Sequence, residues 1–269
     1  MSYKSIILEK ANGVATLTLN RPETLNAWNE VMEMESWNAI QELRQDDDTR
    51  VVIITGAGKG FSSGADLSAS TVEGAERNFA NGMVGRSMKG RVGVWDVCVA
   101  IHNFPKPTIA AVNGIAAGAG TSVAMACDIR IASDKARFSQ IFVKRGLVPD
   151  SAATYFLPRL VGLSKAYELV FTAQIIDAAE AERIGLFSRV VPHEDLGKVA
   201  RELALNIASN PPISISLAKM ALRRSLAAAS VEEQLELENA LQEICFTTED
   251  FKEGVLSFVQ KRAPVYTGR

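Results

Sequence analysis

The sequence predicts an α/β fold followed by a helical C-terminal region. Short apolar runs that are typical of buried strands alternate with helical patterns up to about residue 162, and this alternation favours an α/β core. Beyond that point the patterns are mostly helical. The chain has 269 residues, of which 47% are hydrophobic and 22% charged, the profile of a globular protein with a sizeable core.

The chain begins with a predicted hairpin and a helix. Two β-rich runs flank Asn12-Gly13, a strong signal for a tight hairpin turn. The segment 29–48 has helical spacing, with apolar side chains at Val31, Met34, Trp37, Ile40 and Leu43.

The next elements alternate. We expect "VVIITG" at 51–56 and "KPTIAAVNG" at 106–114 to contain buried strands, "AGAGTSVAMACD" at 117–128 to form a buried helix, and "IRIAS" at 129–133 to form the following strand. The polar segment 68–87 is a candidate mobile loop or frayed helix. Helical patterns then fill 164–174, 177–185, 196–209, 213–228 and 231–246.

Composition argues against several classes of protein. The net charge is −2 with Lys and Arg spread along the chain, so no nucleic-acid footprint or membrane-surface patch is expected. No run is long and apolar enough to span a bilayer, and the N-terminus lacks a secretion signal; we expect a cytoplasmic protein. Cys98, Cys127 and Cys245 are far apart, which predicts neither a metal site nor a disulfide framework.

Common catalytic motifs are missing. The chain has no GxxxxGK[ST] phosphate loop and no HExxH, which argues against nucleotide hydrolysis and zinc proteolysis by the usual patterns. His102 and His193, the two histidines, are interpreted as surface or strand-end residues.

Three stretches could carry chemistry. "GFSSGADLS" at 60–68 is either an ordinary Gly-Ser turn or a site where a ligand meets free backbone N–H groups. "NGIAAGAGTSVAMACD" at 113–128 leads into a helix whose first N–H groups suit an oxyanion, although close packing also selects small residues. In "GLVPDSAATYFLPRLVG" at 146–162, Asp150 is either a helix N-cap or a carboxylate whose raised pKa suits proton transfer.

Together these stretches resemble the crotonase, or enoyl-CoA hydratase/isomerase, superfamily. The resemblance covers nearly the whole chain, from "VATLTLNRPETLNAWN" to "FKEGVLSFVQKRAPVYTG". It implies a crotonase-type spiral of βαβ units: a core at 1–200 with an acyl-CoA site, and a helical trimerisation region at 201–269. Within the superfamily the sequence most resembles ring 1,2-epoxyphenylacetyl-CoA isomerases, through "NGxAAGAG", "GL[IV]PD" and "EGVxxFxxKRxPxxTG".

The resemblance also implies a set of site residues. The backbone N–H groups of Ala65 and Ala119 correspond to the oxyanion donors that stabilise an enolate, and Asp150 corresponds to an acid/base carboxylate. Substrate contacts are implied at Asn26, Ala27, Ser63, Gly64, Asp66, Leu67, Gly118, Phe142, Phe258 and Lys261. No metal and no cofactor are implied, because coenzyme A enters as part of the substrate.

The chain departs from the hydratase pattern at two positions. Hydratases of this family carry two glutamates that handle water, and here those positions hold Ser122 and Phe142. We therefore favour an acyl-CoA isomerase that uses Asp150 alone, in phenylacetate or other aromatic or fatty acid degradation, with Phe142, Trp95 and Tyr155 as candidate lining of the acyl pocket. The alternatives are an enoyl-CoA hydratase and a non-catalytic acyl-CoA-binding protein. The implied assembly is a homotrimer or a dimer of trimers.

Overall fold

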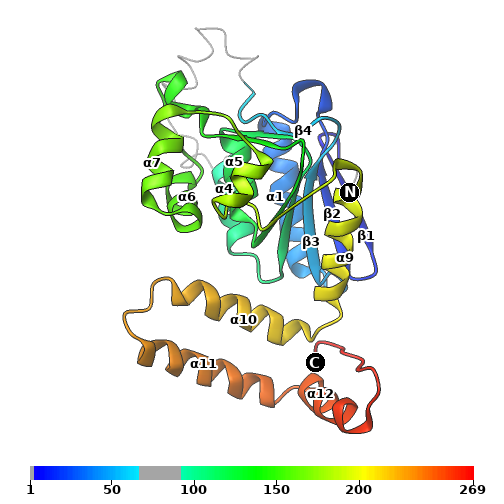
Figure 1. Cartoon of the computed structure of the whole chain (residues 1–269). Coiled ribbons are helices and arrows are strands. Elements are labelled where there is room, and N and C mark those ends of the chain that lie inside the picture. The colour runs from blue at the N-terminus through cyan, green and yellow to red at the C-terminus, as the bar shows by residue number, and fades with distance from the viewer. Residues whose placement is uncertain (1–2, 67–91) are drawn as a thin grey trace.

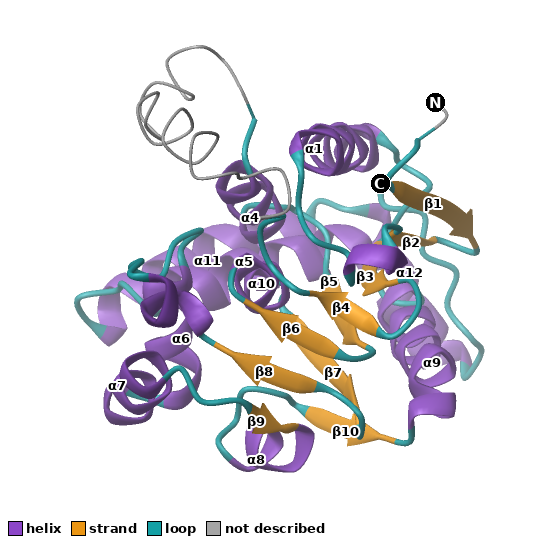
Figure 2. Cartoon of the chain, turned by 90° about the horizontal axis from the view of Figure 1, so that it is seen from above, coloured by secondary structure: helices purple, strands orange, loops and turns teal. Residues whose placement is uncertain are grey.

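The computed structural model describes residues 3–66 and 92–269. Two sheets form the core (Figure 1), a six-stranded one in the order β1-β2-β3-β5-β7-β10 and a four-stranded one in the order β4-β6-β8-β9. Figure 2 shows the smaller sheet beside the larger one, with helices around both. This arrangement confirms the predicted α/β fold.

The chain builds both sheets by a repeated path. Each turn adds one strand to the larger sheet and the next strand to the smaller sheet, and neighbouring turns pair in parallel. The successive pairs are β3 (Val51–Gly56) with β4 (Gly60–Ser62), β5 (Thr108–Val112) with β6 (Ile115–Ala117), and β7 (Ile129–Ser133) with β8 (Arg137–Ser139). Helices α4 (Val94–His102) and α5 (Ala119–Ala126) connect these turns, which gives the expected βαβ spiral.

The N-terminal hairpin is as predicted. Strands β1 (Ile6–Ala11) and β2 (Val14–Leu19) pair antiparallel. Asn12 and Gly13 between them have φ of 56° and 75°. Two adjacent left-handed residues form the turn whose twist matches that of the strands.

Helix α1 (Glu30–Gln45) exists as predicted, capped by the Asn29 side chain, which accepts from the Met32 amide at 2.9 Å. The apolar positions of the helical pattern coincide with the buried face only in part, because Val31 and Met34 are 45% and 42% exposed. A helix turns every 3.6 residues, so positions three apart drift around it. The buried positions instead include Met32, Ser36, Ala39, Ile40 and Leu43.

The larger sheet is covered on both faces. Val52 and Ile54 of β3 pack into a cluster with α1, α4 and α5, whereas Val51 and Ile53 pack against α9 (Leu196–Ala208). Double coverage explains why strands such as "VVIITG" are apolar at consecutive positions.

The segment after residue 162 is mostly helical, but it also contributes β9 (Ile176–Asp177) and β10 (Arg189–Val191), which were not predicted. Helices α6 (Ala153–Val161), α7 (Leu163–Thr172) and α8 (Ala178–Arg183) flank the sheets. The expected boundary at 200/201 falls inside α9, which packs on the core. Among the described residues, no helix combines the length and apolar character needed to cross a membrane.

The last three helices form a separate layer beneath the core (Figure 1). They are α10 (Pro212–Ser225), α11 (Val231–Phe246) and α12 (Glu249–Gln260). Polar contacts join this layer to the core: Lys219 Nζ lies 2.6 Å from Asp128 Oδ2, and Arg223 donates to Asn103 Oδ1 at 2.7 Å.

Candidate active site

The first glycine turn follows β4. Gly64 has φ of +97°, and the residues on either side of Ala65 bond to Trp28: the Trp28 amide donates to the Gly64 carbonyl, and the Asp66 amide to the Trp28 carbonyl, both at 2.8 Å. The amide of Ala65 itself donates to no described residue. This turn therefore offers a backbone donor beside a rigid bridge.

The second glycine turn begins α5. Gly118 has φ 52° and ψ −130°, and Ala119 is the first residue of the helix. Amides of the first helical turn lack partners within the helix and lie at the positive end of its dipole. No described residue accepts from the Ala119 amide, so it too can receive an anion.

Glycine brings the two turns into contact. A Cβ on Gly64 would lie 2.9 Å from the Ala117 carbonyl oxygen and 3.5 Å from the Ala119 nitrogen, and one on Gly118 would lie 3.7 Å from the Gly64 Cα. At Gly64 only a residue without a side chain allows this approach, whereas at Gly118 the contact would be ordinary and the positive φ is what favours glycine. Two backbone donors in adjacent turns are the arrangement that stabilises an oxyanion.

Several residues predicted to bind substrate hold the first turn in place. The Asn26 side chain accepts from the Arg21 amide and donates to the carbonyls of Ala57 and Gly60, at 2.8 to 2.9 Å. Asp66 forms an ion pair with Arg21 at 2.8 Å. The donor capacity of Asn26 is thus used inside the protein.

Two other predicted contacts flank these residues. Ser63 Oγ donates to the Thr24 carbonyl at 3.0 Å, and the buried Ala27 accepts through its carbonyl from Arg21. Leu67 and the segment 68–87 lie outside the described residues.

Asp150 does not cap a helix. The N-cap of α6 is Ala152, which has a left-handed conformation and provides no side-chain cap, so the capping interpretation is wrong. The Asp150 carbonyl accepts from the Ala153 amide at 2.9 Å. Its half-buried carboxylate accepts from Ser151 Oγ at 3.0 Å. Burial raises the pKa of the Asp150 carboxyl, and the Ser151 hydrogen bond partly offsets that rise.

Asp150 is joined directly to the helix that carries Ala119. Ser122, one turn further along α5, is fully buried and donates through Oγ to the Asp150 carbonyl at 3.2 Å. This hydrogen bond, which the sequence analysis missed, brings the carboxylate segment to the first turn of α5.

The aromatic candidates differ in burial. Phe142 lies in a short 3-10 helix (Ile141–Arg145) and is 6% exposed. Its neighbour Ile141 flanks Gly118, since its Cγ2 lies 3.7 Å from a Cβ built there. Trp95, on α4, is partly buried. Tyr155 is more exposed, with its ring 5.8 Å from that of His102 and the Arg159 guanidinium 3.8 Å above it.

Phe258 and Lys261 lie apart from these turns. Phe258, on α12, is 85% exposed, and Lys261 ends the same helix with φ of 54°. Both belong to the lower layer of Figure 1. The described residues include no group of three or more His, Cys, Asp or Glu side chains arranged to hold a metal ion.

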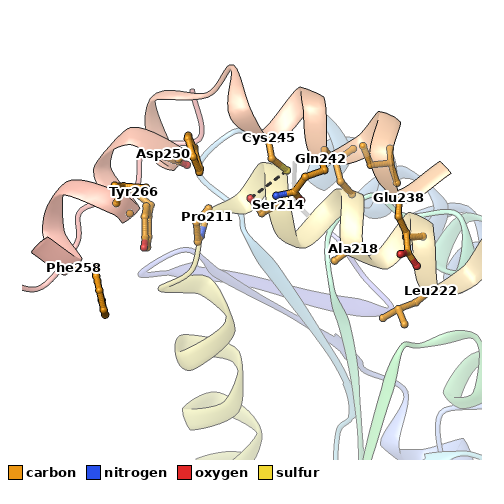
Figure 3. A pocket seen from close by; sticks show the side chains of 16 residues that line it. Pro211, Ser214, Ala218, Leu222, Glu238, Gln242, Cys245, Asp250, Phe258 and Tyr266 are labelled. Carbon is orange, nitrogen blue, oxygen red and sulfur yellow. Dashed lines mark hydrogen bonds between the residues drawn. The ribbon is translucent and has the colours of Figure 1, made fainter. Parts of the chain in front are cut away.

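A second concave region lies within the lower layer. A groove of about 920 Å³ runs between α10, α11 and α12 (Figure 3). Its lining is mostly apolar and includes Leu222, Leu241, Phe251, Phe258 and Tyr266. Ser214 Oγ and Cys245 Sγ approach to 3.7 Å in it. Its lining includes neither the two glycine turns nor Asp150, so we place the candidate active site at the turns and Asp150.

The chain is similar to known proteins over nearly its whole length. Residues 9–269 match the family model described as enoyl-CoA hydratase/isomerase. The chain is 42% identical over 267 residues to a short-chain-enoyl-CoA hydratase of Clostridium acetobutylicum, with 97% of each chain covered. It is 36% identical to the 1,2-epoxyphenylacetyl-CoA isomerase of Escherichia coli, with 98% of each covered. The crystal structure of an enoyl-CoA hydratase from Bacillus anthracis superposes with a TM-score of 0.91 at 35% identity, covering 99% of this chain and 100% of that one.

Proposed function

Because the chain belongs to the enoyl-CoA hydratase/isomerase family, we propose that it is an acyl-CoA isomerase in which Asp150 moves a proton between two carbons of the acyl chain. One observation carries this proposal. The hydratase glutamates have no counterpart here, since their positions hold Ser122 and Phe142. Asp150 is the carboxylate residue whose backbone carbonyl is hydrogen-bonded to Ser122 of α5, the helix that begins at Ala119.

The reaction follows from two groups. In a 3-enoyl-CoA, the Asp150 carboxylate takes a proton from C2, and the electron pair moves onto the thioester oxygen. The amides of Ala65 and Ala119 stabilise that oxyanion, and one such donor is worth about 3 kcal/mol. Asp150 then returns the proton to C4, which yields a 2-enoyl-CoA. The same carboxyl serves as base and then as acid, so one group suffices.

The environment of Asp150 fits this role. A base for a weak carbon acid works best when its pKa lies near the working pH, and burial raises the pKa of Asp150 in that direction. The substrate is an acyl-CoA thioester of fatty acid or aromatic acid degradation, with Phe142 and Trp95 against its acyl chain. No cofactor is needed, because the product has the same oxidation level as the substrate.

A hydratase is the second candidate. Two of the similar proteins described above are named enoyl-CoA hydratases, and that similarity favours water addition to a 2-enoyl-CoA. In this case Asp150 would have to activate water without the two glutamates. The reactions leave different products, because hydration removes the conjugated enoyl thioester and isomerisation creates it.

Ultraviolet absorbance of the conjugated enoyl thioester separates these readings. We expect the protein to be inert with crotonyl-CoA and to raise the absorbance with a 3-enoyl-CoA. We expect Asp150→Asn to lower kcat by roughly 10²- to 10⁴-fold while acyl-CoA binding survives. The matched control is Asp195→Asn, on an exposed carboxylate.

The outcomes are distinct. Loss of the crotonyl-CoA band would establish a hydratase. Substantial isomerase activity in Asp150→Asn would remove Asp150 from the mechanism. Binding of acyl-CoA without turnover of any ester in a mass-spectrometric panel would indicate a non-catalytic binding protein.

A further inference from the structure

Two serine hydroxyls contact Asp150 from different directions. Ser122 Oγ, buried in α5, donates to the Asp150 carbonyl at 3.2 Å. Ser151 Oγ donates to Asp150 Oδ1 at 3.0 Å. Ser122 thus holds the backbone of Asp150, whereas Ser151 holds its carboxylate.

The turn after Asp150 has an uncommon conformation. Ser151 and Ala152 have φ of 52° and 63°. These values lie in the left-handed region, which is unfavourable for most residues other than glycine and asparagine. Such strain persists only where surrounding contacts maintain it. Ser151 is buried, at 4% exposed, and in this conformation its hydroxyl reaches back to the preceding carboxylate.

The carboxylate is left with one oxygen engaged. Oδ1 accepts from Ser151, and Oδ2 bonds to no described residue. A hydroxyl donor favours the charged form of a carboxylate. The contact that orients the Asp150 carboxylate therefore also stabilises its ionised form, which is the form that accepts a proton.

We propose that Ser151 and Ser122 are positioning residues for Asp150, Ser151 by orienting the carboxylate so that Oδ2 faces substrate, and Ser122 by fixing the Asp150 backbone against α5. The proposal rests on the proposed function of Asp150. It assigns the two hydroxyls separable effects: loss of Ser151 changes the proton affinity of the base, and loss of Ser122 changes its distance from the oxyanion donors.

Several titratable side chains lie on the described elements around Asp150. Cys98 on α4 lies within electrostatic reach of Asp150; burial, Cys127 and Asp150 raise its pKa well above the usual range, so the thiol stays neutral in acid. His102, at the end of α4, contacts α6 through Phe156, and burial lowers its pKa. Helix α5 carries no titratable side chain. Further charges on adjoining elements are Asp96, Lys144, Arg145 and Arg159.

The first test is the pH dependence of kcat in the full-length protein. The carboxylate is the active form, so activity falls as pH drops through the pKa of Asp150. Removing the Ser151 donor raises that pKa, and we expect Ser151→Ala to move the acid limb upward by roughly 0.5 to 1 pH unit. Ser151→Gly, which suits the positive φ, should move it equally. Ala152→Gly keeps the hydroxyl and should leave the limb in place, as should His102→Gln.

Ser122 has a different signature. We expect Ser122→Ala to lower kcat by roughly tenfold at every pH, because small misplacements of a catalytic group slow the reaction, without moving the limb. Cysteine is similar in size to serine but is a weaker hydrogen-bond donor, so the kcat of Ser122→Cys should lie between that of Ser122→Ala and that of the unaltered protein. This variant replaces Ser122→Ala in the test if the alanine variant folds poorly. An unchanged kcat in both variants would overturn the role of Ser122.

A measurement without turnover separates this inference from the proposed function. The Asp150 carboxyl is titrated by ¹³C NMR in protein labelled at aspartate Cγ, with Asp150→Asn for assignment. An upward shift in Ser151→Ala supports the Ser151 contact even if Asp150→Asn remains active, a result that would sink the proposed function alone. An unmoved titration in both Ser151→Ala and Ser151→Gly overturns the assignment to Ser151.

Discussion

The sequence around Asp150 does not reveal how this residue is oriented. A carboxylate after proline and before a helical pattern satisfies the rule for an N-cap, yet capping depends on the backbone of the residues that follow. Because Ser151 and Ala152 take left-handed conformations, α6 starts at Ala153 and the Asp150 side chain does not cap it. The sequence therefore identified Asp150 as a candidate catalytic residue, but the orientation of its side chain depended on two backbone angles with no local sequence signal.

Lys261 is a second residue in a costly conformation. It ends α12 with φ of 54°, at the position where helices commonly place glycine. Lys261→Gly relieves the left-handed strain, although the greater conformational freedom of glycine in the unfolded chain offsets part of this gain. We therefore expect the substitution to stabilise the protein by up to about 1 kcal/mol. Urea unfolding measures the gain. Lys261→Ala retains the strain and is the control.

The same two variants test the predicted contact with coenzyme A. If the Lys261 ammonium reaches a phosphate, both should raise the KM for acyl-CoA about equally, although only the glycine variant gains stability. Unchanged KM values in both variants would show that Lys261 does not contact coenzyme A. Its left-handed conformation would then have no role in substrate binding.

For helices and strands, local sequence signals predicted the type of element better than the face that it buries. The hairpin, the buried strands and α1 follow from turn residues and periodicity. The apolar positions of α1 coincide with its buried face only in part, because Ser36 and Ala39 give little hydrophobic signal while Val31 and Met34 face outward. Strands β9 and β10 are two and three residues long, too short for a period to appear. The contact between Gly64 and Gly118 joins residues far apart in sequence, so only the folded chain reveals it.

Helix α12 holds the C-terminal segment through two carboxylates, Asp250 and Glu253, and Glu253 accepts from the Val265 amide at 2.8 Å. Asp250 is 2% exposed and accepts from the amides of Thr267 and Gly268 at 2.7 and 2.8 Å. Arg50 of the core also donates to the Tyr266 carbonyl at 2.7 Å. Asp250 therefore anchors the terminus beside a second link to the core.

We expect Asp250→Asn to destabilise the protein by about 2 kcal/mol, because the amide replaces one charged acceptor with a donor that faces another donor. Hydrogen exchange should accelerate in residues 262–269 before it does in α12. Glu249→Gln, on the neighbouring exposed carboxylate, is the control and should change neither quantity. Unaltered protection of that segment in Asp250→Asn would show that its other contacts, with Arg50 and Glu253 among them, are enough to hold it.

For the whole molecule, the C-terminal layer leaves apolar surface uncovered in a single chain. The groove between α10, α11 and α12 is lined in part by the exposed side chains of Leu222 and Phe258. Further exposed apolar side chains in the same layer are Leu226, Val231 and Val259. Extensive exposed apolar patches mark interaction surfaces, and closed symmetric assemblies bury such surfaces in most homo-oligomers. This exposure makes the layer a candidate interaction surface, and the homotrimer or dimer of trimers that the sequence resemblance implies stays a prediction.

We expect light scattering after gel filtration to give three or six times the chain mass of 29.0 kDa. Phe258→Glu should shift the protein toward monomer, because the substitution places a charge where an apolar side chain is 85% exposed within one chain and would be buried between chains. Its unfolding midpoint at low protein concentration should barely change, since Phe258 makes little contact within the chain. Ile7→Glu, an equivalent change on the N-terminal hairpin, should retain the assembly. A monomeric mass for the unaltered protein at micromolar concentration, with full turnover, would contradict the prediction and make the groove a surface feature of an enzyme complete in one chain.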